Sequence, residues 1–261
     1  MSGFLPDRET QLKEEAARWD EAAAAGYDTP GEGMFEPGLL KATCDLLAEL
    51  AGKGPALELG IGTGRVALPL LSRGLEVRGI DLSPDMLARL RRKPGGAGMP
   101  VYLGDMAETR LEERFTLVYI VFNTLSNLLT QEGQLACFEN AARHLLPGGR
   151  FVVELWVPQL RSLPPGLDAL VTRAEPGYFC VDTYEPLHQL VTSHHIRFGE
   201  GPKASIFRSR HRYAFPAELD LMARQTGFRL EARYADWNKA PFTAASASQI
   251  AVYQKTEELT F

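Results

Sequence analysis

The chain has 261 residues, of which 45% are hydrophobic and 23% charged, so it can bury a sizeable core and lacks the composition of a disordered chain. Its formal net charge of -5 argues against bulk attraction to nucleic acid. No apolar run approaches the roughly 18 residues of a membrane span, and the polar first residues do not resemble a signal peptide. The three cysteines lack zinc-binding spacing, which favours a reducing, cytoplasmic setting and no metal site.

The first part of the chain is predicted to be helical. Residues 9–26 are rich in Ala, Glu and Gln, which is typical of a helix, and Gly26 would end it. A loop punctuated by Gly and Pro follows over residues 27–38, and residues 39–50 return to helical periodicity. We expect residues 1–51 to form an N-terminal helical cap.

From residue 56 onward, short apolar runs alternate with helical segments. Strands that are apolar throughout and that alternate with helices predict a parallel sheet covered on both faces. The expected strands are 56–59, 75–81, 99–105, 115–123 and 150–156, and the expected helices are 64–73, 85–93 and 132–146.

After residue 156 the alternation stops. The runs LHQLVTSHHIRF and ASIFRSRHRYAF flank the turn signal at 199–202 and predict an antiparallel hairpin, to which YFCVDTY could add a third strand. A helix over 216–226 and strands over 228–237 and 248–254 follow.

The predicted fold is α/β. A Rossmann-like, doubly wound sheet of seven mostly parallel strands would have an antiparallel last strand. Residues 52–156 and 216–261 would form this core, and residues 157–215 an antiparallel β insertion that forms a lid or a dimer surface.

A glycine-rich loop, ELGIGTGR, follows the first strand of this core. Gly60, Gly62 and Gly64 permit unusual backbone angles and close approach of a ligand, and the next helix would point its amide groups at that ligand. The loop has no Lys-Ser or Lys-Thr for a triphosphate. It also lacks the G-x-G-x-x-G spacing of dinucleotide folds, because the last glycine would fall on Arg65. A nicotinamide dehydrogenase is therefore a distant alternative.

An acidic residue stands at each of three successive strand ends. Glu58 precedes the glycine loop, where it would suit an ammonium or sulfonium cation better than a pyrophosphate. Asp81 is placed to accept hydrogen bonds from ribose hydroxyls. Asp105 could accept from an adenine amine, with Leu82 and Met106 as apolar faces for the ring. Ammonium, ribose and adenine together describe S-adenosylmethionine.

The ordered set ELGIGTGR, GIDLSPDML, GDM and VFNTLSNL, followed by LLPGGRFVVEL, resembles the class I S-adenosylmethionine-dependent methyltransferases over residues 50–156. The layout, with a cap and an insertion before the last helix, is similar to glycine/sarcosine and deoxyaminosugar N-methyltransferases, in which both close over the acceptor. The family resemblance implies that the methionine part, the ribose and the adenine are held, in that order, by Glu58 and Gly60, by Asp81, and by Asp105 and Met106.

Further cofactor contacts are expected beside the methyl group. Phe122 and Asn123 follow the fourth strand, although Asn123 could equally cap the next turn. Tyr27 would reach the methionine carboxylate or pack in the core, and Arg65 would balance that carboxylate or face solvent. Residues 124–125 replace the Pro-Pro-aromatic turn of nucleic-acid amino-methyltransferases, which counts against base amines as acceptors.

The insertion carries the candidate catalytic groups. His195 and His211 have side chains suited to a general base near neutral pH, and Tyr184 is a candidate wall of the acceptor pocket. Structural roles are the alternative for each. The arginines at alternate positions in 208–212 share one strand face, which would be solvated, pair across a dimer seam, or bind an acidic group of the acceptor.

We therefore expect methyl transfer to an N, O or C atom of a small molecule by in-line displacement. The acceptor would lie between the core, the loop at 27–38 and the insertion. An RNA or protein methyltransferase and a non-catalytic S-adenosylmethionine-binding protein are the alternatives. Neither nucleic acid nor a membrane is expected as a partner, and a homodimer would cover the strand edges of the insertion.

Overall fold

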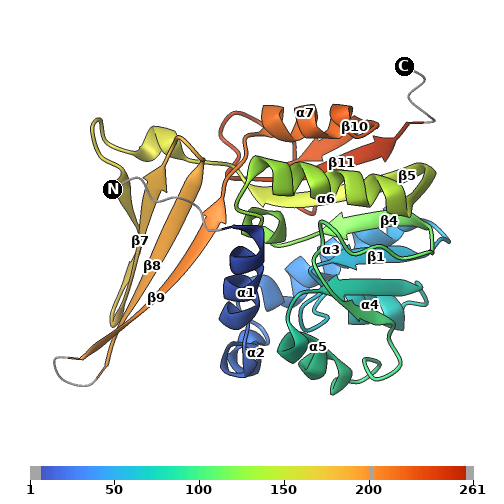
Figure 1. Ribbon diagram of the computed structural model, residues 1–261, viewed down its shortest axis with the longest axis horizontal. Helices are drawn as coiled ribbons and strands as arrows, with labels where there is room; N and C mark the ends of the chain where they lie inside the picture. Colours follow the sequence, from blue (N-terminus) through green and yellow to red (C-terminus); the bar gives the residue numbers. More distant parts are fainter. Residues whose placement is uncertain (1–6, 200–202, 257–261) are drawn as a thin grey trace.

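The computed structural model describes residues 7–199 and 203–256, whose strands form two separate sheets (Figure 1). The larger sheet has seven strands and the smaller has four within this described part. The larger sheet contains β1 (Ala56–Leu59), β2 (Val77–Asp81), β3 (Val101–Leu103), β4 (Phe115–Ile120), β5 (Leu145–Trp156), β10 (Phe228–Tyr234) and β11 (Ser248–Lys255). The smaller contains β6 (Ala169–Glu175), β7 (Tyr178–Glu185), β8 (Leu190–Phe198) and β9 (Ala204–Arg212).

The helices cover both faces of the larger sheet or lie between the two sheets. In Figure 1 the first two helices stand between the smaller sheet and the core. The α-helices are α1 (Arg8–Arg18), α2 (Glu21–Tyr27), α3 (Pro37–Ala51), α4 (Ala67–Ser72), α5 (Pro84–Arg91), α6 (Gln131–His144) and α7 (Pro216–Gln225). Short 3₁₀ turns are η1 (Gly33–Phe35), η2 (Thr124–Asn127) and η3 (Leu160–Ser162).

The strand order of the larger sheet is β10-β11-β5-β4-β1-β2-β3. Strands β1 to β5 pair in parallel, and β11 runs antiparallel to both β5 and β10. The predicted doubly wound sheet with an antiparallel last strand is confirmed. Strand order reverses between β1 and β4, so a ligand crevice is expected beyond the carboxyl ends of these strands.

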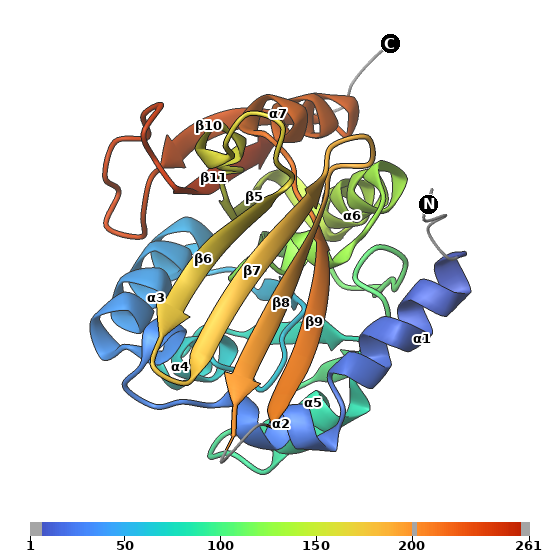
Figure 2. The ribbon, with the colours of Figure 1, turned by 90° about the vertical axis from the view of Figure 1, so that its left-hand side faces the viewer.

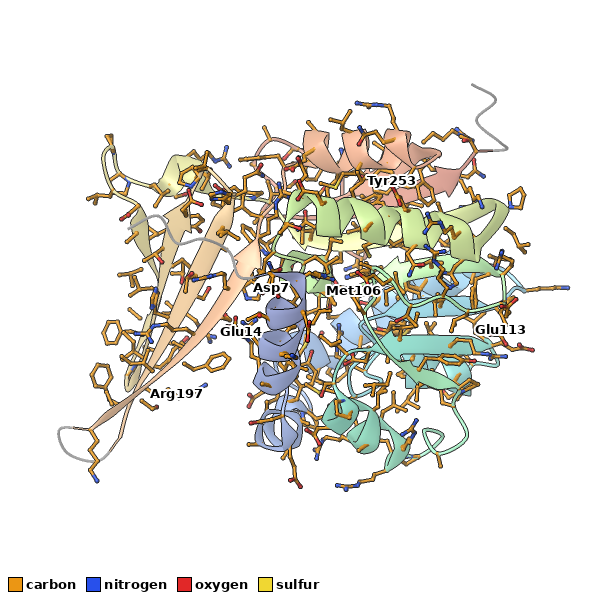
Figure 3. All side chains as sticks on the ribbon, in the orientation of Figure 1. Asp7, Glu14, Met106, Glu113, Arg197 and Tyr253 are labelled. Carbon is orange, nitrogen blue, oxygen red and sulfur yellow. The ribbon has the colours of Figure 1, made fainter. Side chains whose placement is uncertain are left out.

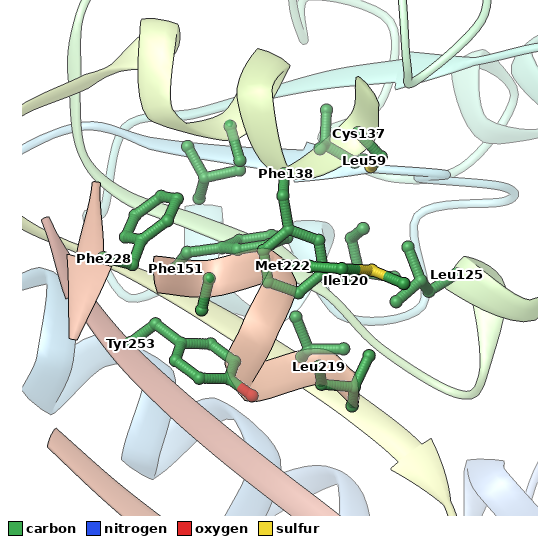
Figure 4. Close-up of a cluster of buried hydrophobic side chains, with 14 of the residues drawn as sticks. Leu59, Ile120, Leu125, Cys137, Phe138, Phe151, Leu219, Met222, Phe228 and Tyr253 are labelled. Atoms are coloured by element: carbon green, nitrogen blue, oxygen red, sulfur yellow. The ribbon is translucent and has the colours of Figure 1, made fainter. Parts of the chain in front are cut away.

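Two apolar layers hold the core together, one on each face of the larger sheet. On one face, α6 and α7 pack on the strands through Phe138, Met222 and neighbours around Phe151 and Tyr253 (Figure 4). On the other face lie α3, α4 and α5, whose apolar side chains include the fully buried Leu47. Residues 37–51 thus pack directly on the sheet.

Several element boundaries differ from the sequence-based expectation. The helix predicted over 9–26 is two helices, because Asp20 begins α2 by accepting a hydrogen bond from the amide of Ala23. The helix predicted over 64–73 begins only at Ala67, since Gly64 has a left-handed φ of 78°. The insertion holds four described strands rather than two or three.

The smaller sheet is attached to the core through a buried polar network at the end of β9. Arg212, 4% exposed, donates to Glu218 Oε1 at 2.6 Å and to Gln134 Oε1 at 2.7 Å. Gln134 in turn donates to the carbonyl of Arg212 at 3.2 Å. The arginine face predicted for 208–212 is therefore divided, because Arg212 is an internal residue of the junction while Arg208 and Arg210 are exposed.

No helix among the described residues is both long and apolar enough to span a bilayer.

Candidate active site

Two cavities adjoin at the carboxyl ends of the parallel strands, within the described part of the chain. We call the first the strand-end cavity. It lies beneath α1, and Met106 is on the core side of that helix (Figure 3). Its core-side lining comes from the glycine loop and from the segments after β2 and β3: Gly60, Gly62, Asp81, Leu82, Met86, Asp105 and Met106.

The second, or inter-sheet, cavity has a volume of about 510 Å³ and lies between the smaller sheet and the ends of β4 and β5. All three candidate catalytic residues, Tyr184, His195 and His211, line it. The two cavities share part of their walls, which is the direct link between them. The shared residues are Arg18, Trp19, Tyr27, Thr124 and Asn127.

The glycine loop takes a conformation that other residues would adopt with strain. Gly60, Gly62 and Gly64 have φ values of 75°, 55° and 78°. A Cβ atom at Gly60 would lie 2.3 Å from Cγ2 of Thr124, so only glycine allows the loop to approach η2 this closely. The loop and η2 can therefore both contribute to the shared wall.

The carboxylates of Asp81 and Asp105 are held in place by main-chain amides. Asp81 accepts from the amides of Gly62 at 2.7 Å and Ser83 at 2.8 Å, while its burial raises the pKa of the carboxyl. Asp105 accepts from the amide of Ala107 at 3.0 Å and forms an ion pair with Arg8 of α1. The Arg8 pair joins α1 to the end of β3 across the strand-end cavity.

Polar contacts also fix the N-terminal helices to the core. Ser83 Oγ donates to the carbonyl of Trp19 at 2.5 Å. Asp28, which follows α2, accepts from Thr63 Oγ1 at 2.7 Å and forms ion pairs with Arg89 of α5 and with Lys93, which follows that helix. These contacts place Trp19 and Tyr27 over both cavities.

Comparison with known proteins agrees with this geometry. A family model described as a methyltransferase domain matches residues 56–149. The structure of the CcbJ methyltransferase from Streptomyces caelestis is similar with a TM-score of 0.76 and 36% identity, covering 95% of this chain and 97% of that one. This chain belongs to the class I S-adenosylmethionine-dependent methyltransferases. The expected family, cofactor and enzyme class are confirmed.

Two curated relatives are more distant. The cypemycin N-terminal methyltransferase of a Streptomyces species is 27% identical over 91% of this chain and 97% of its own length. The dTDP-3-amino-3,6-dideoxy-α-D-glucopyranose N,N-dimethyltransferase of Streptomyces fradiae is 29% identical over 74% of this chain and 69% of its own length.

Glu58, Gly64 and Arg65 do not line either cavity of this methyltransferase. Arg65 donates to the carbonyl of Met34 at 3.0 Å, and its guanidinium carbon lies 5.9 Å and 5.5 Å from the ring centroids of Phe35 and Phe122. In the structure Arg65 therefore joins the loop after α2 to the turn after β4.

Glu58 is 2% exposed and accepts a hydrogen bond from the hydroxyl of Tyr119 at 3.0 Å. Burial raises the pKa of this carboxyl to about 8, so the ligand-free methyltransferase holds it protonated at neutral pH. A cation brought close to Glu58 would favour its ionised form. Contact with the cofactor ammonium stays a prediction.

The turn after β4 carries two successive residues with left-handed backbone angles, Phe122 at φ 51° and Asn123 at φ 64°. The neighbouring strand β5 holds this turn. Phe122 donates its amide to Glu154 Oε2 at 2.6 Å, and Asn123 Oδ1 accepts from the amide of Trp156 at 2.7 Å. Both residues line the inter-sheet cavity rather than the strand-end cavity.

His211 has a defined hydrogen-bonding state. Its Nδ1 lies 3.1 Å from Asn127 Oδ1 and 3.3 Å from Ser126 Oγ. Ser126 donates its own hydrogen to the carbonyl of Asn123 at 2.7 Å, so both neighbours can accept from Nδ1. The proton therefore belongs on Nδ1, and Nε2 carries a lone pair that has no hydrogen-bond partner among the described residues. Burial lowers the pKa of His211 to about 4, which keeps the imidazole neutral.

His195 and Tyr184 differ from His211 in their surroundings. Both ring nitrogens of His195 have partners, Tyr178 Oη at 2.7 Å and Ser209 Oγ at 3.4 Å, and burial lowers the pKa of the imidazole. Tyr184 is 8% exposed and packs on Tyr213 with ring centroids 6.1 Å apart. His211 is thus the histidine of the inter-sheet cavity best prepared to accept a hydrogen bond from a ligand.

Sequence reasoning missed several residues that line these cavities, notably Arg18, Trp19 and Asp182. Arg18 and Trp19 were read as part of one continuous helix, so nothing drew attention to them. For Asp182 a signal was available. Strand alternation in YFCVDTY places it on the same face as Tyr184, the face predicted for the acceptor pocket.

The replacement Glu58→Gln tests the protonated state of this carboxyl. The folded protein keeps the proton up to a pKa of about 8, whereas an unfolded Glu releases it near 4.5, so wild-type stability falls as pH rises between these values. Gln carries no such proton. In urea unfolding without cofactor, the free energy of unfolding of the variant should rise relative to that of wild type as the pH rises. We expect this difference to change by a few kcal/mol between about pH 5 and about pH 8.

The matched control is Glu76→Gln, which changes an exposed carboxyl at the start of the β2 segment. Its stability should follow wild type at every pH. Parallel pH profiles for wild type and Glu58→Gln would show that Glu58 is ionised in the folded, ligand-free protein.

Proposed function

We propose that this protein methylates an amine nitrogen of a small-molecule acceptor bound in the inter-sheet cavity, with S-adenosylmethionine in the strand-end cavity. The observation that carries the proposal is the shared wall, beside which His211 lines the inter-sheet cavity with its Nδ1 held by Asn127. A volume of about 510 Å³ is in the range of small-molecule sites. Strands β7, β8 and β9 then supply the acceptor wall, and helices α1 and α2 cover the cofactor.

The residues of the strand-end cavity suit an adenosyl group. Asp81 and Asp105 offer oriented carboxylates for hydroxyl and amine donors, and the side chains of Leu82, Met86 and Met106 offer apolar surface. When bound, S-adenosylmethionine supplies a methyl group on a cationic sulfur, whose S–CH₃ bond breaks as the bond from the acceptor to carbon forms, leaving a neutral thioether.

An amine acceptor is favoured by the state of His211. The neutral imidazole can accept a hydrogen bond from an N–H group through Nε2, which turns the nitrogen lone pair of a free amine in a fixed direction. Asn127 and Ser126 hold the ring while they accept from Nδ1. Because its pKa is about 4, His211 orients the amine and does not act as the base that takes a proton from it. The proton that the methylated amine loses passes to water.

The names of the relatives agree with nitrogen as the methylated atom. One is an N-terminal methyltransferase and another an N,N-dimethyltransferase of a nucleotide-linked amino sugar.

The three cysteines of this chain are buried free thiols, in keeping with an enzyme of the reducing cytoplasm.

The direct test incubates the purified protein and methyl-labelled cofactor with panels of small amines, phenols and carboxylic acids, and with total RNA and protein. We expect label in amines. His211→Ala should lower kcat for the best amine by roughly 10- to 100-fold and leave cofactor affinity unchanged. His188→Ala, at an exposed histidine in the turn between β7 and β8, is the matched control and should keep wild-type kcat. Label confined to RNA or protein, or full activity of His211→Ala, would refute the proposal.

A further inference from the structure

Three polar side chains form a row across the inner face of the smaller sheet. The register pairs Asp182 of β7 with Ser193 of β8, and Ser193 with Ser209 of β9. Figure 2 shows these strands side by side. All three residues line the inter-sheet cavity, so the row presents a carboxylate and two hydroxyls to whatever occupies it.

The carboxylate of Asp182 has no counter-ion within the described residues. The hydrogen bond it accepts there comes from the Cys180 thiol, with Sγ 3.7 Å from Oδ1. The guanidinium of Arg18, which also lines the cavity, is paired with Glu15 at 2.6 Å, and burial lowers the pKa of the nearby His195 although the charge of Asp182 acts to raise it. A half-buried, unpaired carboxylate favours a cationic ligand group.

The two serines can share such a cation. Ser193 Oγ makes no side-chain hydrogen bond to another described residue, and Ser209 Oγ approaches His195 Nε2 at 3.4 Å. If Ser209 donates to His195, its oxygen can still accept. One carboxylate and two hydroxyl oxygens match the three donors of an alkylammonium group.

This row lies away from His211. In the same register Tyr184, Val191 and His211 form the neighbouring row, nearer the core. Asp182 and His211 are two strands and two residues apart, which separates their backbones by about 12 Å from ordinary strand spacing and rise. One amine cannot contact both side chains at once unless they reach far across the cavity.

We propose that Asp182, with Ser193 and Ser209, forms a second acceptor subsite that binds an ammonium group remote from the nitrogen being methylated. The proposal rests on the proposed amine methylation and deepens it. The acceptor class is then an elongated molecule with a reactive amine at one end and a basic group at the other.

The test measures binding of linear diamines of graded length, and of monoamines of the same lengths, to protein loaded with S-adenosylhomocysteine. Calorimetry should find a diamine that wild type binds at least about tenfold more tightly than its matched monoamine, because its second ammonium gains a hydrogen-bonded charge pair with Asp182. Asp182→Asn should remove this preference. Affinity for S-adenosylhomocysteine and the melting temperature should not change.

Glu175→Gln, at an exposed carboxylate on the adjacent strand β6, is the control and should keep the preference. Equal affinity for diamine and monoamine in wild type, a preference that survives in Asp182→Asn, or no binding of either amine would each overturn the subsite. The labelling panel separates the two proposals. If monoamines are methylated without any diamine preference, only the subsite fails, whereas amine methylation itself fails if no amine is labelled.

Discussion

Replacing Asp81 by Ala is expected to weaken binding of S-adenosylmethionine by about 100-fold or more. The amides of Gly62 and Ser83 orient this carboxylate at 2.7 Å and 2.8 Å, at the edge of the strand-end cavity. Each hydrogen bond from a ribose hydroxyl to a charged acceptor contributes about 1.5–3 kcal/mol, so losing two of them costs about 3 kcal/mol or more, which exceeds the roughly 2.8 kcal/mol of a 100-fold change. Calorimetry with the cofactor and with its demethylated product measures the loss.

Asp81 also helps to hold the glycine loop, so a fold control is needed. Asp81→Asn keeps the size of the side chain, and Glu76→Ala removes an exposed carboxylate just before the same strand. We expect weak cofactor binding in both Asp81 variants at wild-type helix content, and unchanged binding in Glu76→Ala. Wild-type affinity in Asp81→Ala would remove the ribose assignment and with it the interpretation of the strand-end acids.

Replacing Arg212 by Ala should lower the free energy of unfolding by about 3–5 kcal/mol, because it leaves the partly buried Glu218 without its cation. Arg212 is 4% exposed and its guanidinium contacts both Glu218 and Gln134. Arg210→Ala is the matched control, since Arg210 lies two residues away on the same strand face and is exposed. It should stay within about 0.5 kcal/mol of wild type.

Urea unfolding of the two arginine variants and of Glu218→Ala provides the measurement. A double-mutant cycle between positions 212 and 218 should give a coupling well above the error of the method. Equal stability of Arg212→Ala and Arg210→Ala would mean that the junction between the smaller sheet and the core does not depend on this ion pair.

The larger sheet could be predicted because its signals are local. Apolar runs such as β4 are long enough to identify, Ser83 and Pro84 begin α5 as expected, and the glycines mark the ligand turn. The edge strand β6 was missed, since five of its seven residues are exposed and its sequence, ALVTRAE, has no apolar alternation.

The candidate site was harder to predict where side-chain direction depends on tertiary packing. All residues of β1 are buried, so the sequence alone does not show which way the side chain of Glu58 points. In the structure it points into the core, where it meets the hydroxyl of Tyr119, and not into a cavity. The two aromatic rings that contact Arg65 belong to Phe35 and Phe122, which are far from it in the sequence. Strand periodicity correctly put Arg210 and Arg212 on one face, but only the fold brings the end of that face against α6 and α7.

The position of the N-terminal helices has a consequence for the course of catalysis. Arg18, Trp19 and Tyr27 belong to the walls of both cavities, while Arg8 joins α1 to Asp105. On the proposed function, any opening of these helices that released the demethylated cofactor would also uncover the acceptor, because the same side chains cover both. Exchange of the cofactor and retention of the methylated product would then be opposed, so the proposed function predicts release of the product after each methyl transfer.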